Sequence, residues 1–422
     1  MTTRIPAGAR GHAVMAADLA RRAFAPSRGA ARRIGAEVEL LPIDMDTRCI
    51  ASLEHGAHAV LPMLRRFGVT RCWVESQTEK GTPCFRIPAG GRLTFEPGGQ
   101  LEYAAPPAPN ASALIADLRG VLEPLRRFAR RDGLDLAATG IESERDVWSS
   151  PRQLEADRYE RMEAYFATIG PYGARMMRQT ASFQVCLDVG DGEGGRRRWR
   201  MLNAAAPYVV AIFANSPRYD GMLSEHQSVR AECWRRLDPL RTGVVQGEDP
   251  VSSYLAFALR APDMMRRTDE GTYRPFGDWV GAGEVTLDDW HHHLTTLFPE
   301  VRPRGYFEMR GADSIDPSSC AAPLALLGGL AYDDAALAGA LELLGDSAGS
   351  LECAGRAGLR DPGVASASRQ LVDLALAGCA RLGRDFVEDD DLDTARAFFD
   401  RYTLVGRSPA DDVRDAAARA TA

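Results

Sequence analysis

Lysine is nearly absent from this chain of 422 residues, in which Lys80 is the single lysine and arginine supplies the other basic side chains. A mechanism that needs a Schiff-base lysine or a phosphate-loop lysine therefore has one candidate residue. Arginine must make the remaining contacts to phosphates and carboxylates, which suits its bidentate and permanently charged guanidinium. The net charge of −7 argues against nucleic acid as the main partner.

Several sequence motifs that indicate a metal site, a phosphate site, membrane insertion or secretion are missing as well. The eight cysteines include no C-x-x-C pair, so their spacing predicts neither a zinc site nor a small disulfide scaffold, and we expect reduced, mostly buried thiols. The phosphate loop G-x-x-x-x-G-K-[ST] is absent. No apolar run approaches the roughly 20 residues of a membrane span, and the N-terminus lacks the apolar core of a signal peptide. We therefore expect a cytoplasmic protein without membrane contact.

Composition predicts a single domain. Hydrophobic residues make up 45% and charged residues 26% of the chain, which is typical of a globular protein, and no repeat, linker or low-complexity tract divides it. We expect a flexible tail at 1–10 and one catalytic domain at 11–422, with a sheet core at 30–320 and a helical layer at 322–420. Alanine and leucine at helical spacing predict that layer.

Apolar periodicity predicts an α+β fold, in which a mainly antiparallel sheet has helices over its apolar face. Strands are predicted at about 34–43, 134–141, 179–189 and 304–311, with further β-structure and glycine turns at 70–103. Helices are predicted at 11–26, 55–68, 157–168, 196–214, 251–260 and 286–297, with one more that starts near Pro171 and one that Asn110 or Ser112 caps and that runs to about Arg131.

Two of the predicted strands place acidic side chains on one face. Side chains alternate between the two faces of a strand, so Glu37 and Glu39 point one way while the apolar residues beside them point the other. In the same way Glu308 shares a face with Arg310. Acids on one sheet face repel each other unless a positive group lies among them, and hard cations such as Mg²⁺ prefer oxygen ligands. The pattern predicts a sheet with one apolar face and one metal-binding face.

The segment E-P-G-G-Q-L-E at 96–102 adds two further acids, one before a Pro-Gly turn and one after it. Taken alone this segment is a plain turn, and a lone E-x-E is an ordinary exposed pair. The repetition of the arrangement favours a metal site instead, in which glycine lets the backbone approach a ligand closely. The predicted metal ligands are Glu37, Glu39, Glu96, Glu102 and Glu308.

Other polar residues are candidates for substrate contacts. Gln184 lies on the polar face of a predicted strand, where it either faces solvent or contacts metal or substrate. The segment around Trp234 is rich in arginine; some of these charges are solvated, but a site for carboxylates and phosphates needs cations, and we expect one or two to face inward. These arginines are Arg218, Arg230, Arg235, Arg236 and Arg241. The three histidines at 291–293 are expected to be solvated or capping, because adjacent helix residues point in different directions.

The combination of these motifs resembles the plant-type glutamate–cysteine ligase family. The matching segments are G-A-E-V-E at 35–39, F-E-P-G-G-Q-L-E at 95–102, T-A-S-F-Q-V at 180–185 and Y-F-E-M-R-G-A-D at 306–313. The segment H-L-T-T-L-F-P at 293–299 is similar to the bacterial branch, which includes the ligases of ergothioneine biosynthesis. The resemblance runs from about residue 30 to about residue 345.

This resemblance implies a glutamine synthetase-like ligase fold, in which an antiparallel sheet is bent into a funnel. It implies ATP-dependent joining of the glutamate γ-carboxylate to the cysteine amine through an acyl phosphate, which gives γ-glutamylcysteine for glutathione or ergothioneine biosynthesis. The five acids would hold Mg²⁺ against the ATP phosphates. Glu308 and Arg310 would act in catalysis, with Arg310 facing the transferred phosphoryl group. The candidate contacts to ATP or the substrates are Gln184, Arg218, Arg230, Arg241, Lys80 and Arg86.

Three alternatives stay open at this point. A relative with the same acidic core could join a different carboxylate and amine, a metal-dependent hydrolase would turn over without ATP, and a non-catalytic nucleotide-binding protein could keep the fold. The expected partners are the small molecules glutamate, cysteine and ATP, and the oligomeric state is left open between monomer and dimer.

Overall fold

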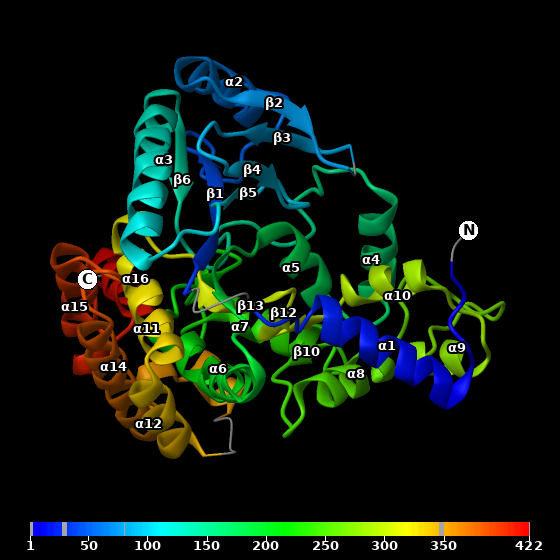
Figure 1. Cartoon of the computed structure of the whole chain (residues 1–422). Coiled ribbons are helices and arrows are strands. Elements are labelled where there is room, and N and C mark those ends of the chain that lie inside the picture. The colour runs from blue at the N-terminus through cyan, green and yellow to red at the C-terminus, as the bar shows by residue number, and fades with distance from the viewer. Residues whose placement is uncertain (1–2, 28–31, 80, 346–349, 422) are drawn as a thin grey trace.

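An antiparallel sheet runs through the middle of the computed structural model, which describes residues 3–27, 32–79, 81–345 and 350–421 (Figure 1). Neighbouring strands follow the order β12-β13-β7-β1-β5-β4-β3-β2, and β6 pairs with the last residues of β1. The strands are β1 (Ile34–Asp44), β2 (Val74–Gln77), β3 (Pro83–Arg86), β4 (Arg92–Phe95), β5 (Leu101–Ala104), β6 (Leu134–Ala137), β7 (Ser182–Asp188), β12 (Val301–Pro303) and β13 (Tyr306–Asp313). The antiparallel sheet predicted from the sequence is confirmed.

Two short pairs of strands lie outside this sheet. The first is the antiparallel hairpin of β8 (Arg218–Tyr219) and β9 (Met222–Leu223). The second is the parallel pair of β10 (Thr242–Gly243) and β11 (Phe298–Pro299), which ties two distant parts of the chain together.

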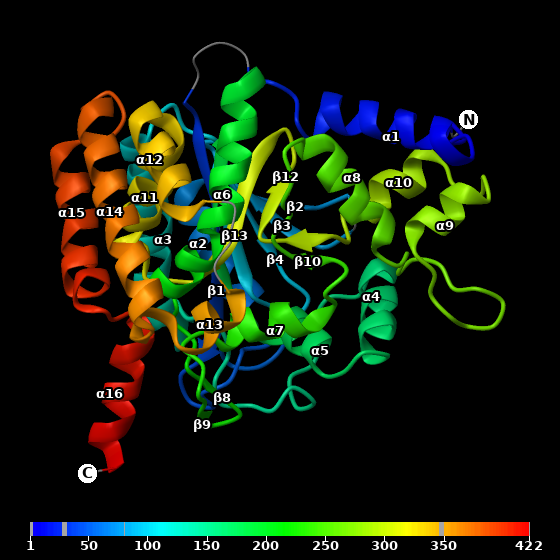
Figure 2. The same cartoon turned by 90° about the horizontal axis from the view of Figure 1, so that it is seen from below.

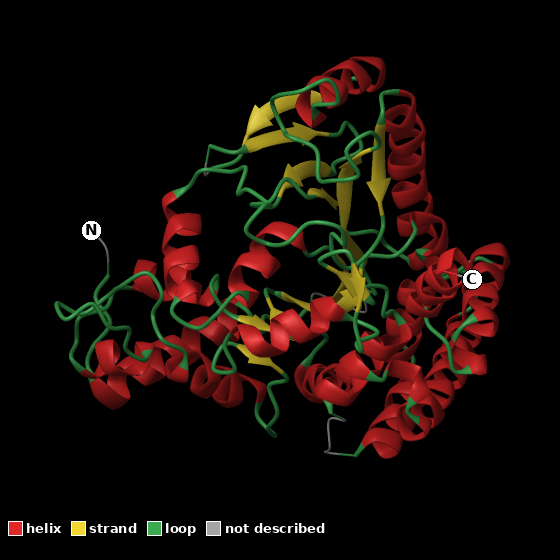
Figure 3. Cartoon of the chain, turned by 180° about the vertical axis from the view of Figure 1, so that it is seen from behind, coloured by secondary structure: helices red, strands yellow, loops and turns green. Residues whose placement is uncertain are grey.

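Helices lie on two sides of the sheet (Figure 2). The first group comprises α2 (Val60–Arg71), α3 (Ala111–Arg131), α11 (Ala321–Tyr332), α12 (Asp334–Leu344), α14 (Pro362–Leu382) and α15 (Asp389–Arg401). The opposite group comprises α1 (Gly8–Arg22), α4 (Asp157–Ala167), α8 (Pro250–Arg260), α9 (Phe276–Gly281) and α10 (Leu287–Leu294). The remaining helices are α5 (Tyr172–Gln179), α6 (Gly192–Ile212), α7 (Val229–Leu237), α13 (Leu351–Arg356) and α16 (Pro409–Thr421). Seen from behind, strands are flanked by helices on both sides (Figure 3).

Strand alternation determines which face of the sheet is apolar. Val38 and Leu40 of β1, and Phe307 and Met309 of β13, are each at most 1% exposed and belong to the main hydrophobic core. Helices α3, α6 and α11 pack against β1, β13 and β7 to form that core. The predicted alternation of apolar and polar residues is therefore confirmed, and the polar residues between these side chains face the opposite group of helices.

Helices make up most of the described C-terminal part of the chain from Ala321 onward. Every residue of α11 is buried, as expected for a helix of alanine, leucine and glycine that is apolar on all sides. It packs against α14 and α15, and the approach is close because a Cβ on Gly329 would lie 2.2 Å from the carbonyl oxygen of Ala375. Among the described residues no single helix has the length and apolar character to cross a membrane, and one pair bent by 95°, 317–332 with 334–344, has them only when both parts are counted together.

Two local expectations are wrong. Residues 3–10 are not a loose tail, because Ile5 is buried and its amide donates to the carbonyl of Val285 over 3.0 Å. His293 is neither solvated nor a cap. Its ring stacks on Phe276 with centroids 4.2 Å apart, and its Nε2 hydrogen-bonds the carbonyl of Ala258 over 2.8 Å. Burial lowers the pKa of His293 to about 3, so the ring is a neutral core residue.

Candidate active site

A cavity of about 610 Å³ lies against the polar face of the sheet. Helices α1, α4, α5, α7, α8 and α10 contribute residues to its other walls. The lining includes seven residues that the sequence had singled out, namely Glu37, Glu39, Glu96, Glu102, Gln184, Arg230 and Arg310. The motifs that lie far apart in the sequence therefore meet in one place.

Strand register brings these side chains together. Glu37 on β1 stands opposite Gln184 on β7, and Glu39 stands opposite Glu102 on β5. On the next strands, β13 is paired with β7 and with β12, so the polar row continues across the sheet. Directly opposed side chains on one face lie within contact distance, and the alternation on each strand thus creates a continuous polar surface.

The turn that follows β4 has a shape that glycine makes possible. Gly99 has φ +91°, which L side chains rarely adopt, and a Cβ on Gly98 would lie 2.1 Å from the carbonyl oxygen of Arg178. The amide of Gly98 donates to the carbonyl of Met177 over 3.1 Å, and the Gln100 side chain donates to the carbonyl of Thr180 over 3.0 Å. This turn is thereby fixed to the end of α5 and holds Glu96 and Glu102 on the same side of the cavity.

We call Glu37, Glu39, Glu96 and Glu102 the cavity acids. One carboxylate oxygen each of Glu39, Glu96 and Glu102 lies within 4.8 Å of the others. Burial, followed by repulsion between these carboxylates, raises the pKa of Glu37 and of Glu102 from the ordinary 4.5 to about 8, and that of Glu96 to about 7. Burial also raises the pKa of Glu39, against the opposing charge of Arg230.

The surroundings of the cavity acids leave room for a cation. Glu39 accepts hydrogen bonds from the amide of Ser182 and from Gln184, and Glu102 accepts one from Thr94. Within the described part of the chain none of the four forms an ion pair with an arginine. A buried cluster of carboxylate oxygens that arginines influence only from beyond ion-pair distance is the donor set that a hard divalent ion such as Mg²⁺ takes, so these residues fit the metal.

Glu308 has a different environment. It is fully buried outside the cavity lining and accepts hydrogen bonds from Arg302 and Arg310, each over 2.8 Å, while Arg304 lies 3.6 Å away. We call these three residues the arginine clamp. Burial disfavours its charge, but the clamp outweighs burial and lowers the pKa of Glu308 to about 2. Arg310 also donates to Gln184 over 2.7 Å, so the clamp reaches the polar row that carries the cavity acids.

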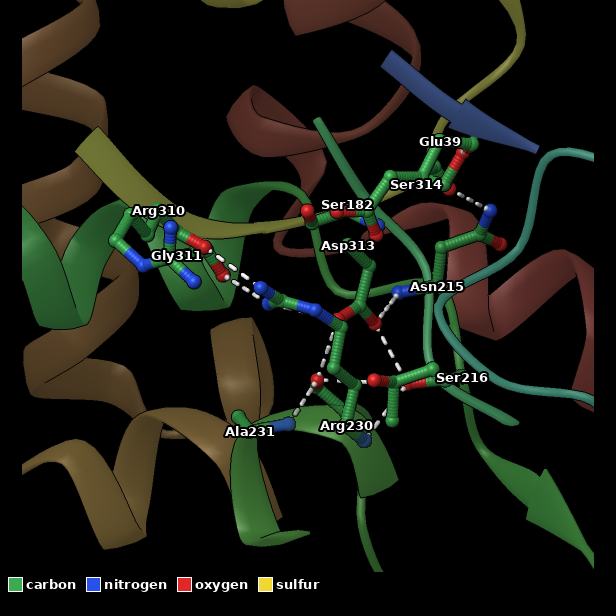
Figure 4. A network of polar contacts seen from close by, with 12 residues as sticks. Glu39, Ser182, Asn215, Ser216, Arg230, Ala231, Arg310, Gly311, Asp313 and Ser314 are labelled. Carbon is green, nitrogen blue, oxygen red and sulfur yellow. Dashed lines mark hydrogen bonds and ion pairs between the residues drawn. The ribbon is translucent and has the colours of Figure 1, made fainter. Parts of the chain in front are cut away.

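A buried carboxylate holds Arg230 in place (Figure 4). Asp313 accepts hydrogen bonds from the hydroxyls of Ser216 and Ser228 over 2.6 and 2.8 Å and from the amide of Asn215 over 2.8 Å. Its charge lies 3.8 Å from Arg230, which donates to the carbonyls of Arg310 and Gly311. Arg230 is thus fixed at the cavity wall by the same strand that carries Arg310.

Residues 33–421 match the profile described as Glutamate-cysteine ligase family 2. The chain belongs to this family. It is 36% identical over 345 residues to the glutamate–cysteine ligase EgtA of Mycolicibacterium smegmatis, across 78% of each chain. It is 32% identical over 269 residues to the chloroplastic glutamate–cysteine ligase of Medicago truncatula, across 60% of this chain and 53% of that one.

A solved structure supports the fold of this family member. The glutamate–cysteine ligase of Francisella tularensis, determined in complex with AMP, superposes with a TM-score of 0.54 at 13% identity, over 93% of this chain and 86% of that chain. The glutamine synthetase-like ligase fold that the motifs implied is therefore confirmed. The fold places the family motifs on adjacent strands around the cavity.

Several predicted contacts lie elsewhere in this family member. Arg218 lies outside the cavity lining and hydrogen-bonds the carbonyl of Gly221 over 2.8 Å. Arg241 is fully buried away from the cavity and donates to Asp238 over 2.7 Å. Arg86 is exposed on β3. Of the arginines around Trp234, only Arg230 lines the cavity, and Lys80 lies outside the described residues.

The sequence reasoning missed other residues that line the cavity. Arg302 and Arg304 alternate with apolar residues just before β13, so the argument from strand faces could have included them. Arg158 and Met162 are four residues apart on α4, a spacing that places both on one face of a helix. The methionines of α5 had no motif that could have marked them.

Proposed function

We propose that this chain is an ATP-dependent glutamate–cysteine ligase, which joins the glutamate γ-carboxylate to the cysteine amine and gives γ-glutamylcysteine for thiol biosynthesis. The observation that carries the proposal is that one cavity holds both negative and positive side chains. The cavity acids lie beside Arg230 and Arg310, whose direct ion pairs are with Asp313 and Glu308 instead. A carboxylate–amine ligase must hold a cation, a triphosphate and two anionic amino acids together, which requires both charges. The relatives from Mycolicibacterium and Medicago are glutamate–cysteine ligases by name.

The cavity acids would hold Mg²⁺, since three of them converge within 4.8 Å and, among the described residues, arginines act on the four only from beyond ion-pair distance. When bound, Mg²⁺ neutralises and orients the phosphates of ATP. Arg302 and Arg310 would contact the phosphates from the side of the clamp, because each keeps free N–H donors beyond those it gives to Glu308 and Gln184.

The reaction forms two bonds in turn. A γ-carboxylate oxygen of glutamate attacks the γ-phosphorus of ATP, ADP leaves, and an acyl phosphate is formed. The cysteine amine then attacks the acyl carbon, phosphate leaves, and the new amide nitrogen loses a proton. Arg310 supplies positive charge where the transferred phosphoryl group carries negative charge. Positioning and charge perform this chemistry, so no protein nucleophile is needed.

The proposal is tested by phosphate release from ATP with Mg²⁺ and L-glutamate, with and without L-cysteine, and by the mass of the product. We expect release that depends on cysteine and a product of γ-glutamylcysteine mass. Release that ignores cysteine but responds to another amine would replace the acceptor and keep the mechanism. Hydrolysis without glutamate, or no turnover with any amine, would overturn the ligase proposal.

Two arginine variants provide a matched comparison for this assay. Arg230→Gln removes a cation from the cavity wall and should lower turnover about 100-fold, which is about 2.7 kcal/mol of transition-state stabilisation. Arg218→Gln removes a cation that is partly exposed and outside the cavity, and should leave turnover within about twofold. Equal effects of both variants would show that the cavity is not the site.

A further inference from the structure

The cavity has a second wall of a different character. Met162 of α4, Met176 and Met177 of α5, Trp234 of α7 and Phe298 of β11 all line it. These residues belong to a hydrophobic cluster separate from the main core. The rings of Trp234 and Phe298 pack 5.4 Å apart, and the methionines are at most 9% exposed. We call this surface the methionine wall.

The methionine wall lies next to the cavity acids. The turn that carries Glu96 is hydrogen-bonded to the carbonyl of Met177, from the amide of Gly98 over 3.1 Å and from Gln100 over 3.4 Å. On the other side, the guanidinium of Arg310 lies 5.5 Å from the ring of Trp234. A small amino acid seated on this wall would therefore be close to the groups that we assign to phosphoryl transfer.

The positively charged side chain of Arg158 lies at one end of the methionine wall. Arg158 lines the cavity one helical turn before Met162. Its two terminal nitrogens donate to the hydroxyl and the carbonyl of Thr295, each over 2.7 Å. Within the described residues no carboxylate lies within 4 Å of it, and Glu96 attracts it from a longer distance. Both hydrogen-bond partners are neutral and Glu96 lies beyond ion-pair distance, so the positive charge of Arg158 can attract an anionic group of a ligand.

We propose that the methionine wall and Arg158 form the subsite for the acceptor amino acid, with the short thiol side chain on the methionines and the α-carboxylate at Arg158. The inference rests on the proposed ligase function and names the residues that select the amine. Methionine is flexible and polarizable, which suits contact with another sulfur. Methionine and phenylalanine offer no hydrogen-bond donor, and the one donor of the wall, the indole N–H of Trp234, is buried. A hydroxyl placed on the methionines therefore loses water without compensation.

The subsite predicts an order of acceptors. L-2-Aminobutyrate, which carries a methyl group in place of the thiol, should be used within roughly tenfold of L-cysteine, and L-serine should be used roughly 100-fold less well. This order follows from the apolar character of the wall. Burying a hydroxyl there without a hydrogen bond costs free energy, whereas burying a methyl group or a thiol costs little.

The experiment compares kcat/KM for these three acceptors at saturating ATP and glutamate in the wild type and in Met176→Gln. Glutamine has a similar length but supplies hydrogen bonds, so we expect the preference for cysteine over serine to fall about tenfold. Met265→Gln is the matched control, because Met265 packs against the same cluster but does not line the cavity. An unchanged preference in Met176→Gln, or an equal change in the control, would overturn the assignment.

A conservative variant covers the case in which Met176→Gln fails to fold. Met176→Leu keeps the apolar surface and removes the sulfur, so the preference for cysteine over 2-aminobutyrate should fall about threefold while the rejection of serine persists. Loss of the serine rejection in this variant would contradict the proposal.

The role of Arg158 is tested by comparing cysteine with cysteamine, which has the amine and the thiol but no carboxylate. Arg158→Gln should raise the KM for cysteine at least tenfold and leave the KM for cysteamine within twofold. A higher KM for glutamate in place of cysteine would assign Arg158 to the donor and overturn its part of the subsite.

A partial reaction distinguishes failure of the proposed ligase function from failure of the proposed acceptor subsite. Positional isotope exchange between the β,γ-bridging and the β-nonbridging oxygens of ATP needs glutamate but no amine. The variants of Met176 and Arg158 described above should retain this exchange within twofold. Absence of both this exchange and ligation in the wild type would overturn the ligase function and the subsite together. Ligation with acceptor preferences that no variant changes would overturn the subsite alone.

Discussion

Two sets of carboxylates lie on the same face of one sheet and have opposite surroundings. The cavity acids face one another, and burial with mutual repulsion raises the pKa of Glu37, Glu96 and Glu102 to about 7 or 8. Glu308 lies among the arginines of the clamp, which lower its pKa to about 2 despite its burial. The residue type is the same in each case, so the neighbours alone decide whether a buried carboxylate is stable as an anion.

This difference gives the two parts of the site different ligands. Where the cavity acids converge, the surrounding arginines do not balance their charge, as the raised pKa values show, and a cation can supply the missing positive charge. Where three arginines share one carboxylate, positive charge remains in excess after Glu308 is neutralised, and phosphate oxygens can use it. A place for a cation and a place for an anion thus stand side by side, connected by Gln184, which contacts both Glu39 and Arg310.

The largest effect should come from removing the carboxylate in the clamp. Glu308→Gln leaves three buried or half-buried guanidinium groups without their shared counter-ion. Breaking a buried ion pair on one side costs about 3–5 kcal/mol, so we expect the free energy of unfolding to fall by that amount, as measured by urea denaturation of the metal-free protein. A denaturation midpoint equal to that of the wild type would show that the clamp is not held by Glu308.

The opposite behaviour is expected from a cavity acid. Glu102→Gln removes one of several repelling carboxylates, so the metal-free protein should be at least as stable as the wild type. Turnover should nevertheless fall about 100-fold, equivalent to about 2.7 kcal/mol, because one metal ligand is lost. Urea denaturation and the phosphate-release assay on one preparation measure both effects. If Glu102→Gln lowers stability and keeps activity, Glu102 behaves as a structural residue like Glu308 and not as a metal ligand.

Much of the fold could be predicted from the spacing of apolar residues and from short sequence motifs. Strand β1 was placed within one residue at each end, and the alternation around Glu37 and Glu39 assigned both faces of the sheet. Helix α3 begins where Asn110, one of the two predicted caps, accepts a hydrogen bond from the amide of Ala113. Local chemistry decides these features. The order of the strands requires pairing between residues more than a hundred positions apart, and no local pattern encodes it.

The site was predicted only in part, for a related reason. Residues inside motifs, such as Gln184 and Arg310, line the cavity as the sheet-face argument suggested. Arginines chosen by their proximity in sequence to Trp234 mostly do not, because α7 turns its side chains toward different neighbours: Arg235 pairs with Glu232, and Arg230 alone reaches the cavity. Charge clusters in sequence predict the presence of cations, whereas the direction of each depends on tertiary packing.

The smallest expected effect concerns pH and tests the cavity acids, with Glu308 predicted to behave in the opposite way at low pH. Glu37, Glu96 and Glu102 have folded pKa values of about 7 to 8, above the ordinary 4.5, and burial also raises the pKa of Glu39, so the folded chain retains protons that the unfolded chain has released. Stability of the metal-free protein should therefore fall as pH rises from about 4.5 to about 8. For Glu308 the folded pKa is about 2, and its contribution is present above 4.5 and is lost as pH falls toward 2.

Thermal unfolding at pH 6 and pH 8.5, with and without Mg²⁺, measures this dependence. Without the cation we expect Tm to be lower at pH 8.5 by on the order of a few degrees. Mg²⁺ should raise Tm more at pH 8.5 than at pH 6, because binding requires carboxylates that have already lost their protons. Glu102→Gln should flatten the pH dependence, since it removes one of the titrating groups. If Mg²⁺ stabilises the protein equally at both pH values, the cavity acids are not its ligands, and the raised pKa values then describe a cluster that remains protonated and binds no cation.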